Sequence, residues 1–296
     1  MLESSEINCP LQITMEFPLQ LAAEVQRNVL AALAEDIGGG DLTALLTSAT
    51  RRSQGTVVSR EDAVLAGTAW FDTCFRYLDP MVVIRWHAGD GEPIAAGRVL
   101  CEIEACTRAL LTAERAALNF LQLLSATATA TRLYVNAVAG TGARIVDTRK
   151  TVPGLRLAQK YAVTCGGGSN HRLGLYDGIL IKENHIMAAG GVTAALEQAR
   201  AIGRSDVFIQ IEVETLEQLA EALDAGAKMI LLDNMSLSQM RQAVGLTAGR
   251  AELEASGGVS LETVRAIAET GVDRISIGGL TKNVRAIDLS LRHSEG

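Results

Sequence analysis

Short apolar runs alternate with amphipathic segments along the second half of the chain. The runs occupy 144–147, 178–182, 207–213, 229–233, 251–255 and 273–278. Between them lie segments with apolar residues at helical spacing, with Ser or Thr near the start and Gly at the end, such as TLEQLAEALDAGA and SLSQMRQAVGLTAG. From the fourth run on, the repeat is roughly 20 to 25 residues. This pattern predicts a parallel sheet with helical crossovers, and six or more units favour a (β/α) barrel over a doubly wound open sheet.

The first half of the chain has a different pattern. Residues 17–35 predict a helix, and short alternating strands with Gly-containing turns follow it. Residues 107–137 predict a long helix that joins the two halves. The triple glycine 38–40 precedes Asp41, which would repel a phosphate, so we expect it to end the first helix. The N-terminal half is therefore a smaller α+β domain.

Length and composition narrow the class of protein. The 296 residues fit two domains, and with 48% apolar but only 4% aromatic residues the core must be aliphatic. The apolar runs are shorter than the ~18 residues of a membrane span, and no secretory signal precedes residue 18. The five scattered cysteines have no metal-binding or disulfide spacing. A pI near 5.3 argues against nucleic acid. We expect a cytoplasmic protein without a nucleic-acid or membrane partner.

Positive charge is concentrated although the net charge is -7. The stretches DTRKTVPGLR and GGGSNHRLGLYDGILIKENH interleave basic residues with glycine and apolar residues. Only five lysines occur, none before position 150, and three of them, Lys150, Lys182 and Lys282, fall at or just past the ends of apolar runs. A single lysine at such a position is explained by a side chain that extends from a strand end to solvent. A random distribution of the five lysines would rarely place three of them at these ends.

Ligands of a parallel α/β barrel bind at the carboxyl ends of its strands. The residues at these ends are Asp147 to Lys150, Lys182, Glu212 and Glu214, Asp233 and Asn234, Ser256 to Gly258, and Gly278 with Gly279. Cations from two strands and carboxylates from two others indicate an organised anion site. The glycine-rich last two ends are typical of a phosphate position, where backbone N–H groups face the anion.

Two further features bear on this anion site. Arg115 lies at helical spacing with Leu111, Leu118 and Leu121, so we expect a buried cation that needs an anion. A salt bridge within the core would serve equally well. Arg172, which follows His171 and a run of glycines, is suited to bidentate carboxylate binding.

These residues occur within a series of motifs that resembles one known family. The motifs EDIGGGDLT, ERAALNFLQLLS, DTRKTVPGLR, KYAVTCGGGSNHRLGLYDGILIKENH, IEVE, LLDNM, EASGG and TGVDRISIGGLT occur in order between about residues 20 and 292. Together they resemble quinolinate phosphoribosyltransferase, also called nicotinate-nucleotide pyrophosphorylase (carboxylating). The resemblance implies a type II phosphoribosyltransferase fold, an open, incomplete α/β barrel with an N-terminal α+β sandwich domain. We place the sandwich at 1–115 with the C-terminal segment 280–296, and the barrel at 116–279.

The resemblance also implies a reaction. Quinolinate and 5-phosphoribosyl 1-pyrophosphate would give nicotinate mononucleotide, pyrophosphate and carbon dioxide in de novo NAD synthesis, with Mg²⁺ as cofactor and a homodimer or an assembly of dimers as the working unit. Because both substrates are polyanions, this reaction accounts for the concentrated cations.

Residues at matching positions acquire implied roles. The implied substrate-binding set is Arg115, Thr148, Arg149, Lys150, His171, Arg172, Lys182, Glu212, Asp233, Ser256, Gly257, Gly258, Ile277, Gly278 and Gly279. The guanidinium groups and the histidine would grip quinolinate, with Arg115 supplied by the partner subunit. The catalytic set is Lys150, Lys182, Glu212 and Asp233, with the two carboxylates also holding the metal together with pyrophosphate. The residues from Ser256 to Gly258 and Ile277 to Gly279 would hold the 5-phosphate.

Two departures and three alternatives remain at this stage. Ser125 and Ala126 stand where many relatives have Ser-Gly, and the LTKN segment lacks a histidine, for which Lys282 is a candidate substitute. Lys182 at a strand end would also suit a Schiff-base aldolase. A molybdate-associated homologue shares the fold, although the complete NHR and TRK motifs favour quinolinate. A non-catalytic anion-binding module would leave Glu212 and Asp233 without a purpose.

Overall fold

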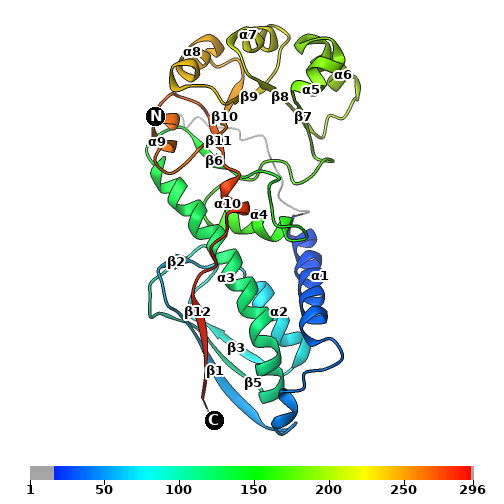
Figure 1. Cartoon of the computed structure of the whole chain (residues 1–296), viewed down its shortest axis with the longest axis vertical. Coiled ribbons are helices and arrows are strands. Elements are labelled where there is room, and N and C mark those ends of the chain that lie inside the picture. Colours follow the sequence, from blue (N-terminus) through cyan, green and yellow to red (C-terminus); the bar gives the residue numbers. More distant parts are fainter. Residues whose placement is uncertain (1–16, 295–296) are drawn as a thin grey trace, which may run out of the picture.

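The structure is a computed structural model that describes residues 17–294. Cys9, the segment searched for a leader, and the outermost ends of the predicted domain at 1–115 and 280–296 lie outside the described residues. Figure 1 shows an elongated molecule with one sheet at each end. The long helix α3 (Thr107–Ala137) runs between them, as the sequence predicted for 107–137.

The N-terminal domain is built on a four-stranded antiparallel sheet of order β12-β1-β5-β3. Its strands are β1 (Arg52–Ser59), β3 (Val83–Trp86), β5 (Val99–Cys106) and β12 (Leu289–Ser294). A small pair is formed by β2 (Ala63–Val64) and β4 (Pro93–Ile94). Strand β12 comes from the C-terminal end of the chain and pairs antiparallel with β1 from Gln54 to Ser59.

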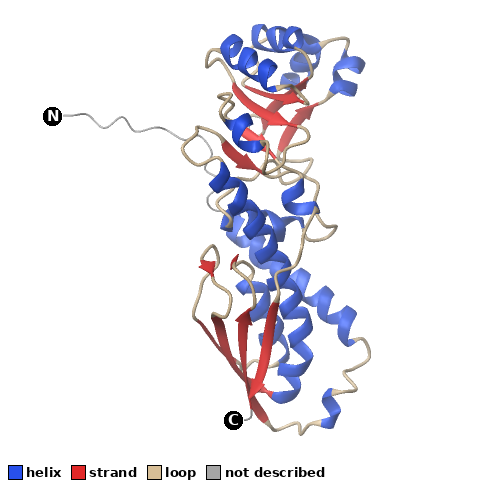
Figure 2. Cartoon of the chain, turned by 60° about the vertical axis from the view of Figure 1, so that its left-hand side comes forward, coloured by secondary structure: helices blue, strands red, loops and turns tan. Residues whose placement is uncertain are grey.

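Helices cover one face of this sheet (Figure 2). They are α1 (Phe17–Ile37), α2 (Thr68–Leu78) and α3, and a short 3-10 helix η1 spans Ala44–Leu46. Trp70, Phe71 and Phe75 of α2 are fully buried, so this core holds the largest fully buried side chains of the described residues. Helix α1 ends at Ile37, where Gly38 takes a positive φ of 51°, so the triple glycine is a helix stop as predicted.

The second domain is an open barrel of six parallel strands in the order β6-β11-β10-β9-β8-β7. The strands are β6 (Arg144–Val146), β7 (Gly178–Ile181), β8 (Phe208–Val213), β9 (Met229–Asp233), β10 (Glu252–Ser256) and β11 (Arg274–Ser276). From β7 to β11 each strand lies beside its predecessor in sequence, which is the order of a barrel and not of a doubly wound sheet. The predicted incomplete barrel is confirmed, because β6 and β7 lie at opposite edges.

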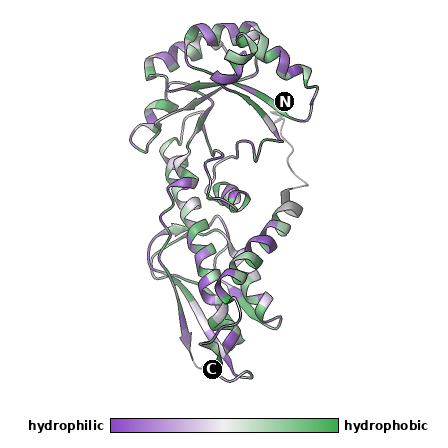
Figure 3. Ribbon diagram, turned by 45° about the vertical axis from the view of Figure 1, so that its right-hand side comes forward, coloured by the Kyte–Doolittle hydropathy of each residue, from purple (hydrophilic) through white to green (hydrophobic). Residues whose placement is uncertain are grey.

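Helices α5 (Glu183–Ala189), α6 (Val192–Ala201), α7 (Leu216–Asp224) and α8 (Leu237–Thr247) cover the outer face of this sheet, and α9 (Val264–Ala268) packs beside β11 (Figures 1 and 3). Helices α4 (Arg156–Cys165) and α10 (Gly279–Lys282) lie below the sheet, where both pack on α3. The predicted N-terminal caps are present in α7 and α8, where Thr215 and Ser236 accept backbone N–H groups. The hydrophobic core of this domain is aliphatic, with Ile211, Ile230 and Ile275 fully buried.

The two domains share helix α3. It packs on α2 in the first domain and on α4 in the second, and the predicted boundary at residue 115 falls within it. Among the described residues, no helix is long and apolar enough to cross a membrane.

Candidate active site

The carboxyl ends of the six parallel strands gather the charged residues that the sequence singled out. We call this group the strand-end cup and define it by the residues Thr148, Arg149, Lys150, Arg172, Lys182, Glu212, Asp233, Ser256, Gly257, Gly258 and Gly278. Direct contacts join neighbours: Lys182 Nζ lies 2.6 Å from Glu212 Oε2, and Ser256 pairs in register with Asp233. Lys150 lies against Gly278, because a Cβ built there would be 2.8 Å from Lys150 Cδ. Lys150, Lys182, Glu212 and Asp233 thus occupy one end of one sheet.

The cationic side of the cup contains two neighbouring guanidinium groups, those of Arg149 and Arg172, that form no ion pair within residues 17–294. The pKa of Arg172 is lowered, first by burial and then by the positive charge of Arg149, although the negative charge of Asp177 opposes this shift. Arg172 donates to the Gly178 carbonyl at 3.1 Å, whereas the buried Nε of Arg149 has no hydrogen-bond partner among the described residues. Two neighbouring cations with an unsatisfied buried donor favour an anionic ligand, and the fork of a guanidinium suits a carboxylate.

The acidic side of the cup is formed by adjacent strands. Glu212 forms an ion pair with Lys182, and the neighbouring Asp233 accepts a hydrogen bond from Asn234 Nδ2 at 2.8 Å. Asn234 has a positive φ of 53°, a conformation that asparagine tolerates better than most residues, and its N–H donates to the Ser256 carbonyl. The backbone at the end of β9 is thereby fixed so that Asp233 stays at the rim.

The donor set of this acidic side fits Mg²⁺ shared with a substrate. Carboxylate oxygens are the ligands Mg²⁺ prefers, and the ion ordinarily keeps waters and substrate phosphates in its shell. No group of three or more His, Cys, Asp or Glu that could hold an ion occurs within residues 17–294. The residues present fit an ion that would take a minority of its ligands from Glu212 and Asp233 and the rest from water and a bound ligand.

The glycine-rich ends of β10 and β11 leave backbone donors open. Gly257 has a φ of 103°, and a Cβ there would lie 2.1 Å from Asn234 Oδ1, so a side chain is excluded. In the part of the chain that the structure describes, the N–H groups of Gly257 and Gly258 have no acceptor in the protein. Ile277 is buried, and α10 begins just after it. The geometry suits a phosphate bound by backbone N–H groups.

Beneath the cup lies a layer of buried polar side chains that the sequence analysis did not assign to a site. We call it the barrel floor and define it as Asp147, Lys160, His171, Gln210, Glu254 and Arg274, all less than 10% exposed. Lys160 Nζ lies 2.5 Å from Asp147 Oδ1 with both side chains fully buried. Lys160 lies in the chain between the two basic stretches of the sequence, and its side chain faces inward. The sequence signal that could have predicted this layer is the presence of polar residues, such as Gln210, at inward-facing positions of otherwise apolar strands.

His171 occupies the floor and not the open cup. Its Nε2 lies 2.7 Å from Gln210 Oε1, and its Nδ1 accepts the N–H of Arg172 at 2.7 Å. Both ring nitrogens are therefore engaged within the protein. Burial lowers the pKa of His171 below its ordinary value of 6.5, although the negative charge of Glu254 opposes this shift.

A buried brace joins the loop after β6 to the turn after β11. Thr281 Oγ1 donates to the Lys150 carbonyl at 2.7 Å, and Gln159 Nε2 donates to the Thr281 carbonyl at 2.7 Å. Gln159 Oε1 in turn accepts the N–H of Val152 at 2.8 Å. The brace holds the two halves of the cup together. Lys282, the candidate substitute for the missing histidine, is exposed beside it.

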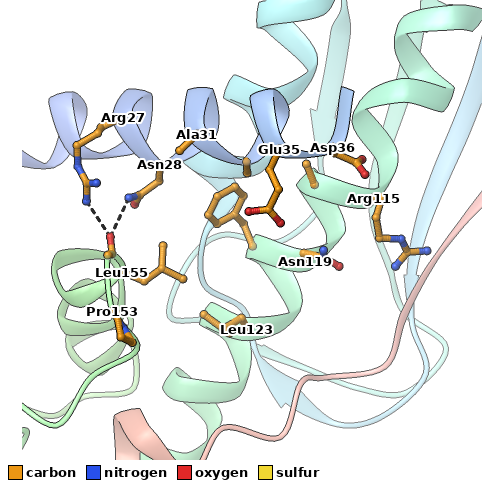
Figure 4. A pocket seen from close by; sticks show the side chains of 14 residues that line it. Arg27, Asn28, Ala31, Glu35, Asp36, Arg115, Asn119, Leu123, Pro153 and Leu155 are labelled. Atoms are coloured by element: carbon orange, nitrogen blue, oxygen red, sulfur yellow. Dashed lines mark hydrogen bonds between the residues drawn. The ribbon is translucent and has the colours of Figure 1, made fainter. Parts of the chain in front are cut away.

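The N-terminal domain reaches the same loop through α1 (Figure 4). Arg27 and Asn28 donate to the Gly154 carbonyl at 2.7 and 3.1 Å. Asn28 is buried and accepts the indole N–H of Trp70 at 3.0 Å, so the loop after Arg149 and Lys150 is anchored in the first domain's core.

The prediction that Arg115 is buried is wrong. Arg115 is exposed, at the edge of a cavity of about 380 Å³ between α1, α3 and the 153–155 loop, and its guanidinium points away from that cavity (Figure 4). The buried stripe of α3 runs through Leu110, Leu118 and Leu121, whereas Leu111 is 37% exposed and shares the outer face with Arg115. Arg115 makes no ion pair with any residue in 17–294, so the predicted alternative of a core salt bridge is also wrong.

Known proteins resemble the chain over nearly its whole length. A family model described as "Quinolinate phosphoribosyl transferase, C-terminal domain" matches residues 127–292, and the corresponding N-terminal domain model matches residues 41–125.

Among curated proteins, a probable nicotinate-nucleotide pyrophosphorylase [carboxylating] of Bacillus subtilis (strain 168) is 43% identical over 87% of this chain and 89% of its own length. The chloroplastic nicotinate-nucleotide pyrophosphorylase [carboxylating] of Oryza sativa subsp. japonica is 37% identical over 98% of this chain and 83% of its own length. The solved structure of the nicotinate-nucleotide pyrophosphorylase from Francisella tularensis superimposes with a TM-score of 0.89 at 42% identity, covering 92% of this chain and 97% of that one.

Proposed function

The chain belongs to the quinolinate phosphoribosyltransferase family, and from that premise we propose that its strand-end cup is where the reaction takes place. The enzyme transfers the phosphoribosyl group of 5-phosphoribosyl 1-pyrophosphate to quinolinate and releases pyrophosphate and carbon dioxide, which gives nicotinate mononucleotide for NAD synthesis. The observation that carries the assignment to the cup is the pair Arg149 and Arg172, two neighbouring cations that form no ion pair among the described residues, with the buried Nε of Arg149 left without a hydrogen-bond partner there.

Quinolinate binds on the cationic side of the cup. Arg149 and Arg172 bind its two carboxylates through their guanidinium forks, and Lys150 and Thr148 lie beside them at the end of β6. Lys182 lies across the cup and is held by Glu212 at 2.6 Å. The dicarboxylate thereby replaces the repulsion between the two guanidinium groups with charge-assisted hydrogen bonds.

The ribosyl donor binds on the opposite side. The N–H groups of Gly257, Gly258, Gly278 and Gly279 receive the 5-phosphate together with Ser256 and Ile277. Glu212 and Asp233 face the ribose, where negative charge stabilises the cationic, oxocarbenium-like ring that forms as pyrophosphate leaves. These two carboxylates also hold Mg²⁺, which supplies charge neutralisation for pyrophosphate when it is bound.

The reaction then depends on placement. The pyridine nitrogen forms a bond to the anomeric carbon while the bond to pyrophosphate breaks, and pyrophosphate keeps that electron pair. The resulting pyridinium accepts the electrons of the adjacent carbon–carboxylate bond as carbon dioxide departs, and a proton takes the vacated position. The fixed cations and carboxylates of the cup need little reorganisation during these steps.

Arg115 completes the cup from outside the subunit. Its guanidinium is exposed on α3 and points away from the cavity beside α1 (Figure 4), which supports a homodimer in which Arg115 of the partner subunit reaches the quinolinate carboxylates. Mixing an Arg115→Ala variant with a Lys182→Ala variant should restore activity in hybrid sites. A mixture as inactive as its two components would exclude a shared site. We place the reaction in the cytoplasm.

One assay tests the function, and a trapping experiment tests the alternative of a Schiff-base aldolase. Wild-type enzyme with quinolinate, 5-phosphoribosyl 1-pyrophosphate and Mg²⁺ should release carbon dioxide and pyrophosphate in equal amounts, and Arg149→Ala should release both at least about a hundredfold more slowly. Absence of both products from the wild type would overturn the assignment. A Schiff-base mechanism on Lys182 would instead be revealed by borohydride trapping of a keto substrate, but the ammonium group of Lys182 is occupied by its ion pair with Glu212.

A further inference from the structure

The barrel floor lies one layer below the residues proposed to bind substrate, on the same strands. Gln210 precedes Glu212 by two positions on β8, and Glu254 precedes Ser256 by two positions on β10. Because alternate residues of a strand face the same side, each pair points into the barrel at successive depths. Gln210 and Glu254 are each 1% exposed. A glutamine and a glutamate buried this deeply in aliphatic strands need internal partners.

The contacts between these side chains have a defined direction. A backbone N–H only donates, so the bond from Arg172 to His171 Nδ1 at 2.7 Å requires that this nitrogen carries no proton. The ring proton of neutral His171 is then on Nε2 and is donated to Gln210 Oε1 at 2.7 Å. Gln210 consequently turns its amide nitrogen away from His171 and donates to Glu254 Oε2 at 3.1 Å.

Glu254 determines this direction. Its carboxylate only accepts hydrogen bonds, so an amide flipped at Gln210 would set its oxygen against the carboxylate and its nitrogen against His171 Nε2. Arg274 Nε lies 3.3 Å from the same Glu254 oxygen and balances its charge. The order of donors therefore runs from the Arg172 backbone through His171 and Gln210 to Glu254.

The backbone around His171 is fixed as tightly as its ring. Its N–H donates to Asp147 Oδ1 at 2.8 Å, and its carbonyl accepts from Lys160 Nζ at 3.0 Å. The next residue in the chain, Arg172, is half-buried in the cup, so its backbone position is set by the floor while its guanidinium remains available to a ligand.

We propose that Gln210 is a positioning residue for quinolinate, oriented by Glu254, which fixes His171 as its Nε2-protonated neutral form and through it places Arg172. This inference rests on the proposed function, because it assumes that Arg172 binds a quinolinate carboxylate. It assigns His171 an indirect part in binding: the imidazole holds the arginine, and the arginine holds the substrate. Neither Gln210 nor Glu254 touches substrate.

The experiment combines a spectroscopic and a kinetic measurement on the full-length enzyme. Nitrogen-15 NMR of the histidine side chains at pH 7.5 should show His171, assigned by its loss in His171→Asn, as the Nε2-protonated form. In Gln210→Met, which keeps the volume but removes both amide groups, His171 should become a mixture of forms. The KM for quinolinate should rise about tenfold, while the KM for 5-phosphoribosyl 1-pyrophosphate stays within about twofold.

Two further variants keep the test decisive. Thr247→Val changes a buried polar group of α8 remote from the cup and should leave the histidine signal and both KM values unchanged. Glu254→Gln keeps the shape but removes the carboxylate that orients Gln210, and it should produce a mixed His171 signal even if Gln210→Met does not fold. An Nδ1-protonated or doubly protonated His171 in the wild type, or equal changes in both KM values, would overturn the proposal. The NMR measurement needs no substrate, so it still tests how Gln210 and Glu254 fix the protonation of His171 even if quinolinate is not a substrate.

Discussion

The barrel floor and the strand-end cup stand on the same strands, one layer apart, and treat charge in opposite ways. In the floor, Lys160 and Asp147 are both fully buried and neutralise each other at 2.5 Å. In the cup, the Nε of Arg149 has no partner among the described residues, and the side chain of Lys182, although paired with Glu212, remains 48% exposed. Charges that are satisfied internally support the site, whereas charges left open are the ones a polyanionic substrate completes.

Breaking the floor should give the largest loss of stability. Lys160→Met leaves Asp147 buried without its counter-ion, so the free energy of unfolding should fall by about 3–5 kcal/mol in denaturant titrations. The matched control is Lys228→Met, which alters an exposed lysine and should change that free energy by less than about 0.5 kcal/mol. If Lys160→Met lowers the free energy of unfolding by less than about 1 kcal/mol, the buried ion pair between Lys160 and Asp147 does not stabilise the fold.

Breaking the cup should reduce activity without a comparable loss of stability. Arg149→Ala removes a cation that serves only the ligand, so kcat/KM for quinolinate should fall about 10²- to 10³-fold while the unfolding free energy stays within about 0.5 kcal/mol. Arg149→Lys keeps the positive charge but loses the two-pronged guanidinium group, so its kcat/KM should lie between those of the wild type and Arg149→Ala. The control Arg204→Ala lies in a surface ion pair with Asp206 and should retain full activity. Equal stability losses for Arg149→Ala and Lys160→Met would abolish the distinction between the two layers.

A smaller change should disturb the cup through packing alone. Gly278→Ala would place a Cβ 2.8 Å from Lys150 Cδ, so the lysine must move and kcat/KM should fall about tenfold. Gly245→Ala is the matched control, because Gly245 has open space around it in the last turn of α8, and the change should raise stability by about 0.5–1 kcal/mol without affecting kinetics. Unchanged kinetics for Gly278→Ala would show that the position of Lys150 at this turn does not matter.

The pH dependence of stability sharpens the comparison with the smallest expected effect. Burial lowers the pKa of His171, so below the ordinary value of 6.5 the unfolded chain binds a proton that the folded protein does not. Stability should therefore fall as the pH drops below about 6.5, by at most about 1.4 kcal/mol for each pH unit from this residue. The difference between wild type and His171→Asn in unfolding experiments from pH 5 to 8 isolates this contribution. A difference that does not vary with pH would contradict a neutral, buried His171.

The sequence by itself determined the elements and the shared end of the strands. The apolar runs at 178–182 and 229–233 became β7 and β9 within one residue, and the helix predicted at 107–137 was found with the same bounds. Local periodicity is set by which residues are apolar, and the carboxyl ends of parallel strands necessarily meet. Lys150, Lys182, Glu212 and Asp233 were consequently placed together from their positions after the strands. Their individual roles toward substrate stay predictions.

Only the tertiary structure decided which charged side chains face inward. Lys160 and Lys182 are equally basic in sequence, yet one is sealed against Asp147 and the other lines the cup. Arg115 has apolar residues at helical spacing but lies on the outer face of α3, because neighbouring elements cover a different stripe of that helix. The direction of the hydrogen bonds at His171 depends on Gln210 and Glu254, which lie 39 and 83 positions away in the chain. Burial and partner choice arise from contacts between distant segments, and no local pattern encodes them.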